Sequence, residues 1–119
     1  MSPLNILVID NEEVICDACH LVLTERGHHV DYCKTGTSGL QAASRGGYDL
    51  VLLDIKLPDM DGMDILQMLR KEMPELYVIV MTGYATLANA VQAMKLGAAD
   101  YLSKPFTDDE LLEAVEKAV

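Results

Sequence analysis

The sequence lacks features that mark several broad classes of protein. It has no tryptophan, one phenylalanine and three cysteines, and its 9 basic residues are outnumbered by 19 acidic ones. Three cysteines cannot build a disulfide framework, so the composition favours a reducing, cytoplasmic compartment. The net charge of −10 disfavours direct contact with nucleic acid or with an anionic membrane surface, because the phosphates of both would repel it.

Long hydrophobic runs are missing as well. The run near the middle of the chain, 76–81, has six residues, whereas a helix that spans a bilayer needs about 20. The first residues, MSPLN, show neither the basic segment nor the cleavage site of a signal peptide. Half of the 119 residues are hydrophobic, which is enough for one domain with a buried core. We therefore expect residues 1–119 to form a single domain.

Short apolar runs alternate with amphipathic segments along the whole chain. The apolar runs predict strands at 5–10, 28–33, 48–54, 76–82 and 99–103. The segments between them predict helices: one with Ile15, Ala18, Cys19, Val22 and Leu23 on its inner face, three at 35–44, 63–72 and 86–96, and a last one opened by the capping box of Thr107 and Glu110. This alternation predicts an α/β fold, a (βα)5 flavodoxin-like, doubly wound parallel sheet with strand order 2-1-3-4-5.

Reactive side chains follow four of the five predicted strands. Asp10 and Asn11 end the first strand, Asp54 the third, Thr82 the fourth, and Lys104 follows the fifth. In an open parallel sheet, ligands bind beyond the carboxyl ends of the strands. The order 2-1-3-4-5 makes these four ends neighbours, so we expect two carboxylates, a hydroxyl and an ammonium group on one rim of the sheet.

This combination of groups predicts phosphoryl chemistry. Two adjacent carboxylates repel each other unless a cation lies between them, and hard oxygen ligands suit Mg²⁺. A lysine and a hydroxyl complete a cradle for a tetrahedral anion, where catalysis depends on positioning and charge stabilisation. A carboxylate in such a cradle can act as the nucleophile and become an acyl phosphate.

Four segments carry a resemblance to a known family: VIDNEE at 8–13, LVLLDIKLPDMDG at 50–62, VIVMTGYA at 78–85 and ADYLSKPF at 99–106. Through them the chain resembles the receiver domain of two-component response regulators over essentially its whole length. The resemblance implies a phosphorylation-controlled signalling switch rather than a classical enzyme. It also implies that Asp54 accepts a phosphoryl group from a histidine kinase. Residues 1–119 would then be the N-terminal part of a longer regulator, or a stand-alone receiver, with any output domain outside them.

The resemblance also assigns roles at the rim. Asp10, Asn11, Asp54 and the backbone carbonyl of Lys56 would hold Mg²⁺. Thr82 would contact the phosphoryl group. Lys104 would pair with the same group.

Further roles follow from the same resemblance. Tyr101 would be an aromatic switch, coupled to Thr82, and the Lys104–Pro105 peptide bond would be cis. Lys56 and Tyr84 would tune the rate of dephosphorylation. The face built by the fourth helix, the fifth strand and the last helix would control the output, transcription, and would support a homodimer.

Asn11 departs from the family pattern, which has a second acidic residue at this position. An amide oxygen can ligate a metal but brings no charge, which leaves open whether Asp10 or Glu12 compensates. The segments MTGYAT and MKLGAADYL resemble regulators of the NtrC type, enhancer-dependent activators with an ATPase and a DNA-binding domain downstream.

Other functions fit the residues less well. A phosphatase or phosphotransferase would need an acid two residues after Asp54, where Lys56 stands, and a cap segment for which the chain has no room. An FMN carrier would need a phosphate-binding loop after the first strand, where Asp10, Asn11 and Glu12 stand instead. A receiver that has lost phosphorylation remains an alternative because of Asn11.

Two further motifs are interpreted as structural. The segment C-x-x-C-H at 16–20 is typical of haem attachment, but its position on a helix favours buried or half-buried thiols. Asp59, Asp61 and Asp64 have no glutamate at the spacing of a calcium loop, so they predict a solvated loop.

Overall fold

The computed structural model describes residues 2–83 and 86–119. Within them, strands and helices alternate strictly: β1 Asn5–Ile9, α1 Glu13–Glu25, β2 His29–Cys33, α2 Gly36–Ser44, β3 Leu50–Asp54, α3 Gly62–Glu72, β4 Tyr77–Thr82, α4 Leu87–Lys95, β5 Asp100–Ser103 and α5 Asp108–Ala118. None of the helices in these ranges combines the length and the apolar character needed to cross a bilayer.

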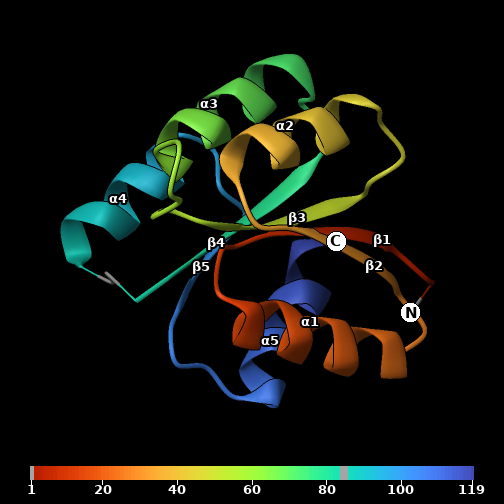
Figure 1. The fold of residues 1–119 in the computed structure, drawn as a ribbon. Helices are drawn as coiled ribbons and strands as arrows, with labels where there is room; N and C mark the ends of the chain where they lie inside the picture. Colours follow the sequence, from red (N-terminus) through yellow and green to blue (C-terminus); the bar gives the residue numbers. More distant parts are fainter. Residues whose placement is uncertain (1, 84–85) are drawn as a thin grey trace.

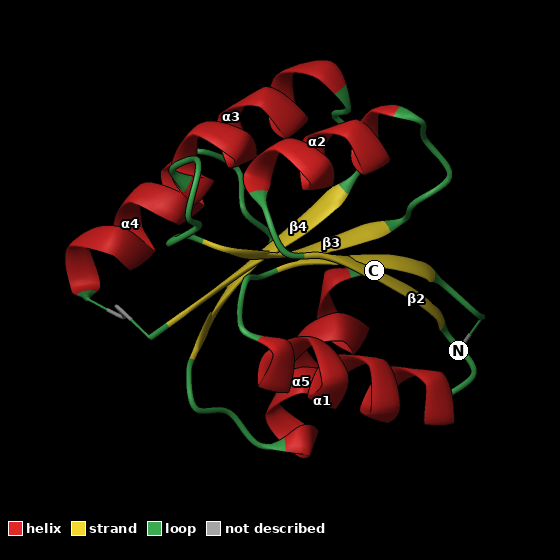
Figure 2. Ribbon diagram, viewed as in Figure 1, coloured by secondary structure: helices red, strands yellow, loops and turns green. Residues whose placement is uncertain are grey.

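The strands form one parallel sheet in the order β2-β1-β3-β4-β5, which confirms the predicted topology. Helices α1 and α5 cover one face of the sheet, and α2, α3 and α4 cover the other (Figures 1 and 2). The register pairs Ile9 with Leu53, Asp54 with Met81 and Thr82 with Ser103. The carboxyl ends of β1, β3, β4 and β5 therefore lie along one rim, as predicted.

Strand β3 shows why the apolar runs are continuous. All five of its residues are buried. Leu50 and Leu52 belong to the core under α1 and α5, whereas Val51 and Leu53 belong to the core under α2, α3 and α4. Because successive side chains point to opposite faces, a strand covered on both sides must be apolar at every position.

Strands β2, β4 and β5 begin one residue later than the apolar pattern predicts, and β3 begins two residues later. Polar residues anchor the chain just before β3. Tyr48 and Asp49 precede β3. The Tyr48 hydroxyl donates to Asp31 at 2.7 Å, and the Asp49 carboxylate accepts from the Asn5 backbone N–H at 2.8 Å. These contacts tie the start of β3 to its neighbour β1 and to β2 beyond it.

Local signals begin and end the helices where the sequence predicts. Thr107 and Glu110 form the capping box of α5, with both reciprocal hydrogen bonds present. Gly27 and Gly97, at φ +89° and +98°, follow α1 and α4 in a left-handed conformation that other residues rarely adopt.

The cysteines of the C-x-x-C-H segment are both buried and free, as the structural interpretation predicted. Burial raises the pKa of the Cys16 thiol to about 11 and that of Cys19 to about 12, so both stay protonated at neutral pH. Their role is to fill the core between α1 and the sheet.

Candidate functional site

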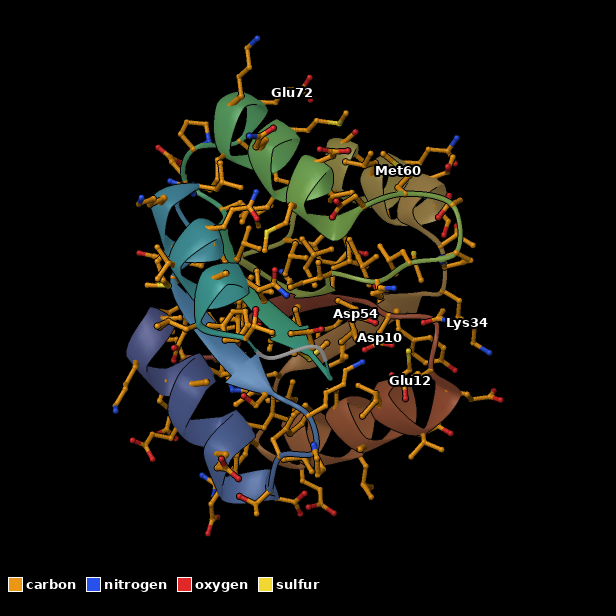
Figure 3. All side chains as sticks on the ribbon, turned by 90° about the vertical axis from the view of Figure 1, so that its left-hand side faces the viewer. Asp10, Glu12, Lys34, Asp54, Met60 and Glu72 are labelled. Carbon is orange, nitrogen blue, oxygen red and sulfur yellow. The ribbon has the colours of Figure 1, made fainter. Side chains whose placement is uncertain are left out.

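Three buried polar residues stand at the ends of the central strands. Asp10 follows β1, Asp54 ends β3 and Thr82 ends β4, with relative exposures of 0%, 3% and 0%. Asp10 and Asp54 lie side by side at the rim of the sheet, with Glu12 just beyond them at the start of α1 (Figure 3). Buried carboxylates without charge compensation are costly, so the position of the nearest cation decides the electrostatics of this rim.

Lys104 supplies that cation. Its Nζ atom lies 2.6 Å from Asp10 Oδ2, 2.8 Å from Glu12 Oε1 and 3.3 Å from Asp54 Oδ2. The Lys104 side chain is only 7% exposed. Its backbone N–H donates to the Thr82 carbonyl at 2.9 Å, and the Lys104–Pro105 bond is cis. One ammonium group thus bridges three carboxylates from two different parts of the chain.

The pKa values of this cluster are shifted by burial and by mutual charge. Burial raises the pKa of Asp54, and the Asp10 charge raises it further, while Lys104 acts in the opposite direction. Burial alone would lower the pKa of Lys104, but hydrogen bonds to Asp10 and Glu12, with the charges of Asp10 and Asp54, raise it above its usual range. Lys104 is therefore a permanent cation at neutral pH.

The donor atoms fit a hard divalent cation. One carboxylate oxygen from each of Asp10, Glu12 and Asp54 lies within 4.8 Å of the others. Asp10 Oδ2 is buried and is ion-paired with Lys104 at 2.6 Å. Clustered carboxylates are the ligands that Mg²⁺ takes in proteins.

An open hollow of about 380 Å³ lies next to these carboxylates. Its lining includes Asp54, Asn11, Glu12, Lys56, Leu57, Pro58 and Gly83. The hollow places Asn11 and Lys56 beside Asp54, where the sequence expected them. The Lys56 backbone N–H donates to Asp54 Oδ1 at 3.3 Å, which helps to orient this carboxylate.

The loop between β3 and α3 is more ordered than the sequence suggested. Lys56 and Asp61 form an isolated antiparallel bridge, and the Gly62 N–H donates to the Ile55 carbonyl at 2.7 Å. A Cβ at Gly62 would overlap the backbone of Asp54 and Ile55, so only glycine permits this approach.

The carboxylates of this loop have structural partners that the sequence interpretation missed. Asp59 and Asp61 are exposed, as expected of a solvated loop. Asp61 also caps α3 through the Met63 N–H at 2.9 Å, and Asp59 caps α2. An aspartate before a helix start is a recognisable cap signal for Asp61. No local signal points to Asp59, whose helix lies earlier in the chain.

Tyr101 lies half-buried on the face of the sheet covered by α3 and α4. Burial raises the pKa of its phenol, while a hydrogen bond from the Thr86 backbone N–H lowers it. Because Thr86 is the N-cap of α4, this contact joins β5 to the start of that helix. Tyr84, the other tyrosine given a role from the sequence, lies outside the described residues.

The fold and the rim define a flavodoxin-like domain with an acidic, lysine-bridged site. Residues 6–116 match the family model of the response regulator receiver domain. The chain belongs to this family, which is one of signalling domains rather than of enzymes.

Relatives of known sequence or structure match the chain over nearly its whole length. The chain is 39% identical over 119 residues to the uncharacterised transcriptional regulatory protein YkoG of Bacillus subtilis, covering 100% of this chain and 52% of that protein. It thus spans about half the length of this and similar curated relatives. A CheY-like receiver domain of Methanospirillum hungatei superposes with a TM-score of 0.92 at 35% identity, over 98% of this chain and 93% of the other.

Two further structures bear on function. A response regulator of Burkholderia pseudomallei, solved with a phosphorylated aspartic acid and a calcium ion, has a TM-score of 0.86 at 34% identity, over 92% of this chain and 65% of the other. NtrX of Brucella abortus has a TM-score of 0.92 at 34% identity, over 98% of this chain and 27% of the other. Similar receivers therefore occur in regulators of quite different length.

The Lys104 ion pairs predict a pH-dependent loss of stability in the Lys104→Ala variant. Removing one partner of a buried charge cluster costs about 3 kcal/mol at pH 7. The pKa of Asp54 is raised already and should rise further without the cation. Because a raised carboxyl pKa favours folding only while the group is protonated, the deficit should grow as the pH rises from about 4 to 7.

Urea unfolding of Lys104→Ala and wild type at several pH values, with a chelator present, measures this dependence. Lys117→Ala is the matched control, because Lys117 pairs with Glu113 at 2.7 Å on the exposed surface. A deficit that is the same at pH 4.5 and pH 7 would show that Lys104 does not compensate the rim carboxylates.

Proposed function

We propose that Asp54 accepts a phosphoryl group from a histidine kinase and that the phosphorylated domain controls an output domain beyond residues 1–119. The observation that carries this proposal is the placement of Asp54. Its carboxylate is buried at the end of β3, faces Lys104 at 3.3 Å and borders an open hollow. The phosphorylated aspartic acid in the Burkholderia relative supports the same chemistry here.

The residues of the rim suit an in-line transfer. An Asp54 oxygen attacks phosphorus, the bond from phosphorus to the histidine nitrogen breaks, and the released imidazole keeps the electron pair and takes up a proton. Thr82 and Lys104 bind the phosphoryl oxygens. Bound Mg²⁺ would supply charge neutralisation, held by Asp10, Asn11, Asp54 and the Lys56 carbonyl, with Glu12 adjacent.

Asp54→Asn should abolish acyl-phosphate formation while keeping the fold, because asparagine is nearly isosteric but is not nucleophilic. Wild type and variant are incubated with Mg²⁺ and a small phosphodonor, and intact mass spectrometry counts added phosphates. Asp64→Asn, an exposed change in the first turn of α3, should label like wild type. Labelling of Asp54→Asn would contradict the assignment, and an unlabelled wild type would favour the receiver that has lost phosphorylation.

The affinity for Mg²⁺ should follow the charge of the rim. Asn11→Asp adds a carboxylate beside the hollow and should tighten binding several-fold. Glu12→Gln removes one and should weaken it, because each ligand charge strengthens the attraction of the cation. Calorimetric titration measures both variants. Unchanged affinity in Asn11→Asp would mean that this side chain does not face the metal, and unchanged affinity in Glu12→Gln would exclude Glu12 in the same way.

Lys56 and Tyr84 are proposed to set the lifetime of the phosphorylated state. Lys56 is exposed and lines the hollow that an attacking water would enter. The long, charged Lys56 side chain can orient a water molecule that approaches Asp54. Self-dephosphorylation would then depend on these two side chains rather than on a dedicated enzymatic base.

The switch is proposed to run from Thr82 to α4. A phosphoryl group on Asp54 would draw the Thr82 hydroxyl toward it and open space for Tyr101 to turn further inward. Since Tyr101 is hydrogen-bonded to the N-cap of α4, its movement would shift that helix. A coupling of a few kcal/mol is enough to make a minor state dominant.

The face made by α4, β5 and α5 is proposed as the output surface and as a homodimer contact. Leu87, Val91 and Met94 form an apolar stripe along α4, with exposures of 82%, 43% and 49%. An output in transcription, a cytoplasmic location and a regulator of the NtrC type remain part of this proposal. The NtrX relatives support the regulator type, and the shorter curated regulators leave it open.

Phosphorylation should change the association state of the domain through this stripe. Sedimentation with and without phosphodonor should detect the change in wild type and not in Leu87→Glu, which should still be phosphorylated. Leu21→Glu, on the opposite layer in α1 and 60% exposed, is the control and should behave like wild type. If association and the amide exchange of residues 86–105 do not respond to phosphorylation, the α4 face is not the output surface.

A further inference from the structure

Asp59 joins two segments that are distant in sequence. It lies in the loop between β3 and α3, yet its carboxylate accepts hydrogen bonds from the start of α2. The Gly36 N–H donates to Oδ1 at 2.7 Å, and the Thr37 N–H and hydroxyl donate to Oδ2 at 2.9 and 2.7 Å. The local N-cap, Thr35, accepts from the Ser38 N–H at 3.1 Å. Asp59 therefore completes the cap of α2 from another part of the chain.

The charge of Asp59 strengthens this contact. Hydrogen bonds to a carboxylate are stronger than those to a neutral acceptor, and the start of a helix carries a partial positive charge. The hydrogen bonds from the Thr37 hydroxyl and the Thr37 and Gly36 N–H groups lower the pKa of Asp59 to about 2. The carboxylate is thus ionised throughout the physiological pH range.

Packing holds the same two segments together. Gly36 is buried, and a Cβ added there would come within 2.9 Å of Met60 Cβ and 3.0 Å of Ile65 Cδ1. Met60, labelled in Figure 3, directly follows Asp59 in the loop. The start of α2 and the tip of the loop therefore meet at a distance that leaves no room for a side chain at position 36.

The other end of this loop is attached to the site. The Lys56 N–H donates to Asp54 Oδ1 at 3.3 Å, and Lys56 pairs with Asp61 across the loop. The Gly62 N–H closes the base by donating to the Ile55 carbonyl at 2.7 Å. The base of the loop is therefore fixed to Asp54, and its tip is fixed to α2 through Asp59.

We infer that Asp59 is a positioning residue: by holding the loop tip on α2, it fixes the Lys56 backbone and, through Lys56, the Asp54 carboxylate. Its consequence for metal binding rests on the function proposed above, whereas its effect on the loop does not. Residues that do not touch a metal but hold its ligands in place determine how well those ligands are oriented.

Asp59→Asn tests this inference, with Asp64→Asn as the matched control. Both changes remove one exposed negative charge near the start of α3, but the Asp64 side chain makes no hydrogen bond or ion pair within residues 2–83 and 86–119. Without metal, amide hydrogen exchange at Lys56 and Gly62 should become faster in Asp59→Asn and not in Asp64→Asn. The dissociation constant for Mg²⁺ should rise by about tenfold in Asp59→Asn alone.

The outcomes separate this inference from the proposed function. Both variants are studied well below their unfolding temperatures, so that a general loss of stability does not alter the exchange at Lys56. If wild type fails to bind Mg²⁺, the proposed metal site is wrong, and the metal-free exchange still decides the role of Asp59. Exchange and Mg²⁺ affinity equal to those of Asp64→Asn would overturn the inference and leave Asp59 as a helix cap only.

Discussion

The ion pairs of Lys104 are the interaction on which the rest of the site depends. Two carboxylates, Asp10 and Asp54, are buried side by side at the ends of adjacent strands. Such a pair is tolerated only with a cation between or beside it. Lys104 reaches both from the end of β5, at 2.6 and 3.3 Å. Lys104 therefore compensates the charge of two carboxylates that the fold buries together.

The sheet dictates where these charges can stand. Every central strand is covered on both faces, so each position inside it must be apolar, and β3 accordingly runs Leu50 to Leu53 before its aspartate. The first polar position is the residue at the rim. Parallel pairing brings the rims of β1, β3, β4 and β5 into one row. Two-sided burial thus gathers the polar groups without any direct pairing signal in the sequence.

Two-sided burial also sets how much of the site the sequence could predict. Asp54 and Thr82 end long apolar runs, so their position at the rim followed from the run lengths and the strand order. The contact of Glu12 with Lys104 was harder to predict from the sequence. Glu12 is the N-cap of α1, its side chain is 56% exposed, and the contact depends on the conformation of that side chain. The contact of Asp59 with α2 was missed, because it joins residues 22 and 23 positions apart across two elements. Periodicity reports which face of an element is buried, but it does not report which loop lies over which helix end.

The same contacts set the order in which the site can rearrange. An ammonium group has three protons, and those of Lys104 are directed at three carboxylates. If Asp54 is phosphorylated as proposed, Lys104 would have to weaken one of these contacts to bind a phosphoryl oxygen. Asp10 is fully buried, and its Oδ2 has no other donor among the described residues, so releasing it is costly. The Glu12 carboxylate is largely exposed and water can solvate it when it is released. Of its two partners other than Asp54, Glu12 is thus the one that Lys104 would release at the lower cost, so the charge of Glu12 would not prevent the lysine from turning to the proposed phosphoryl group.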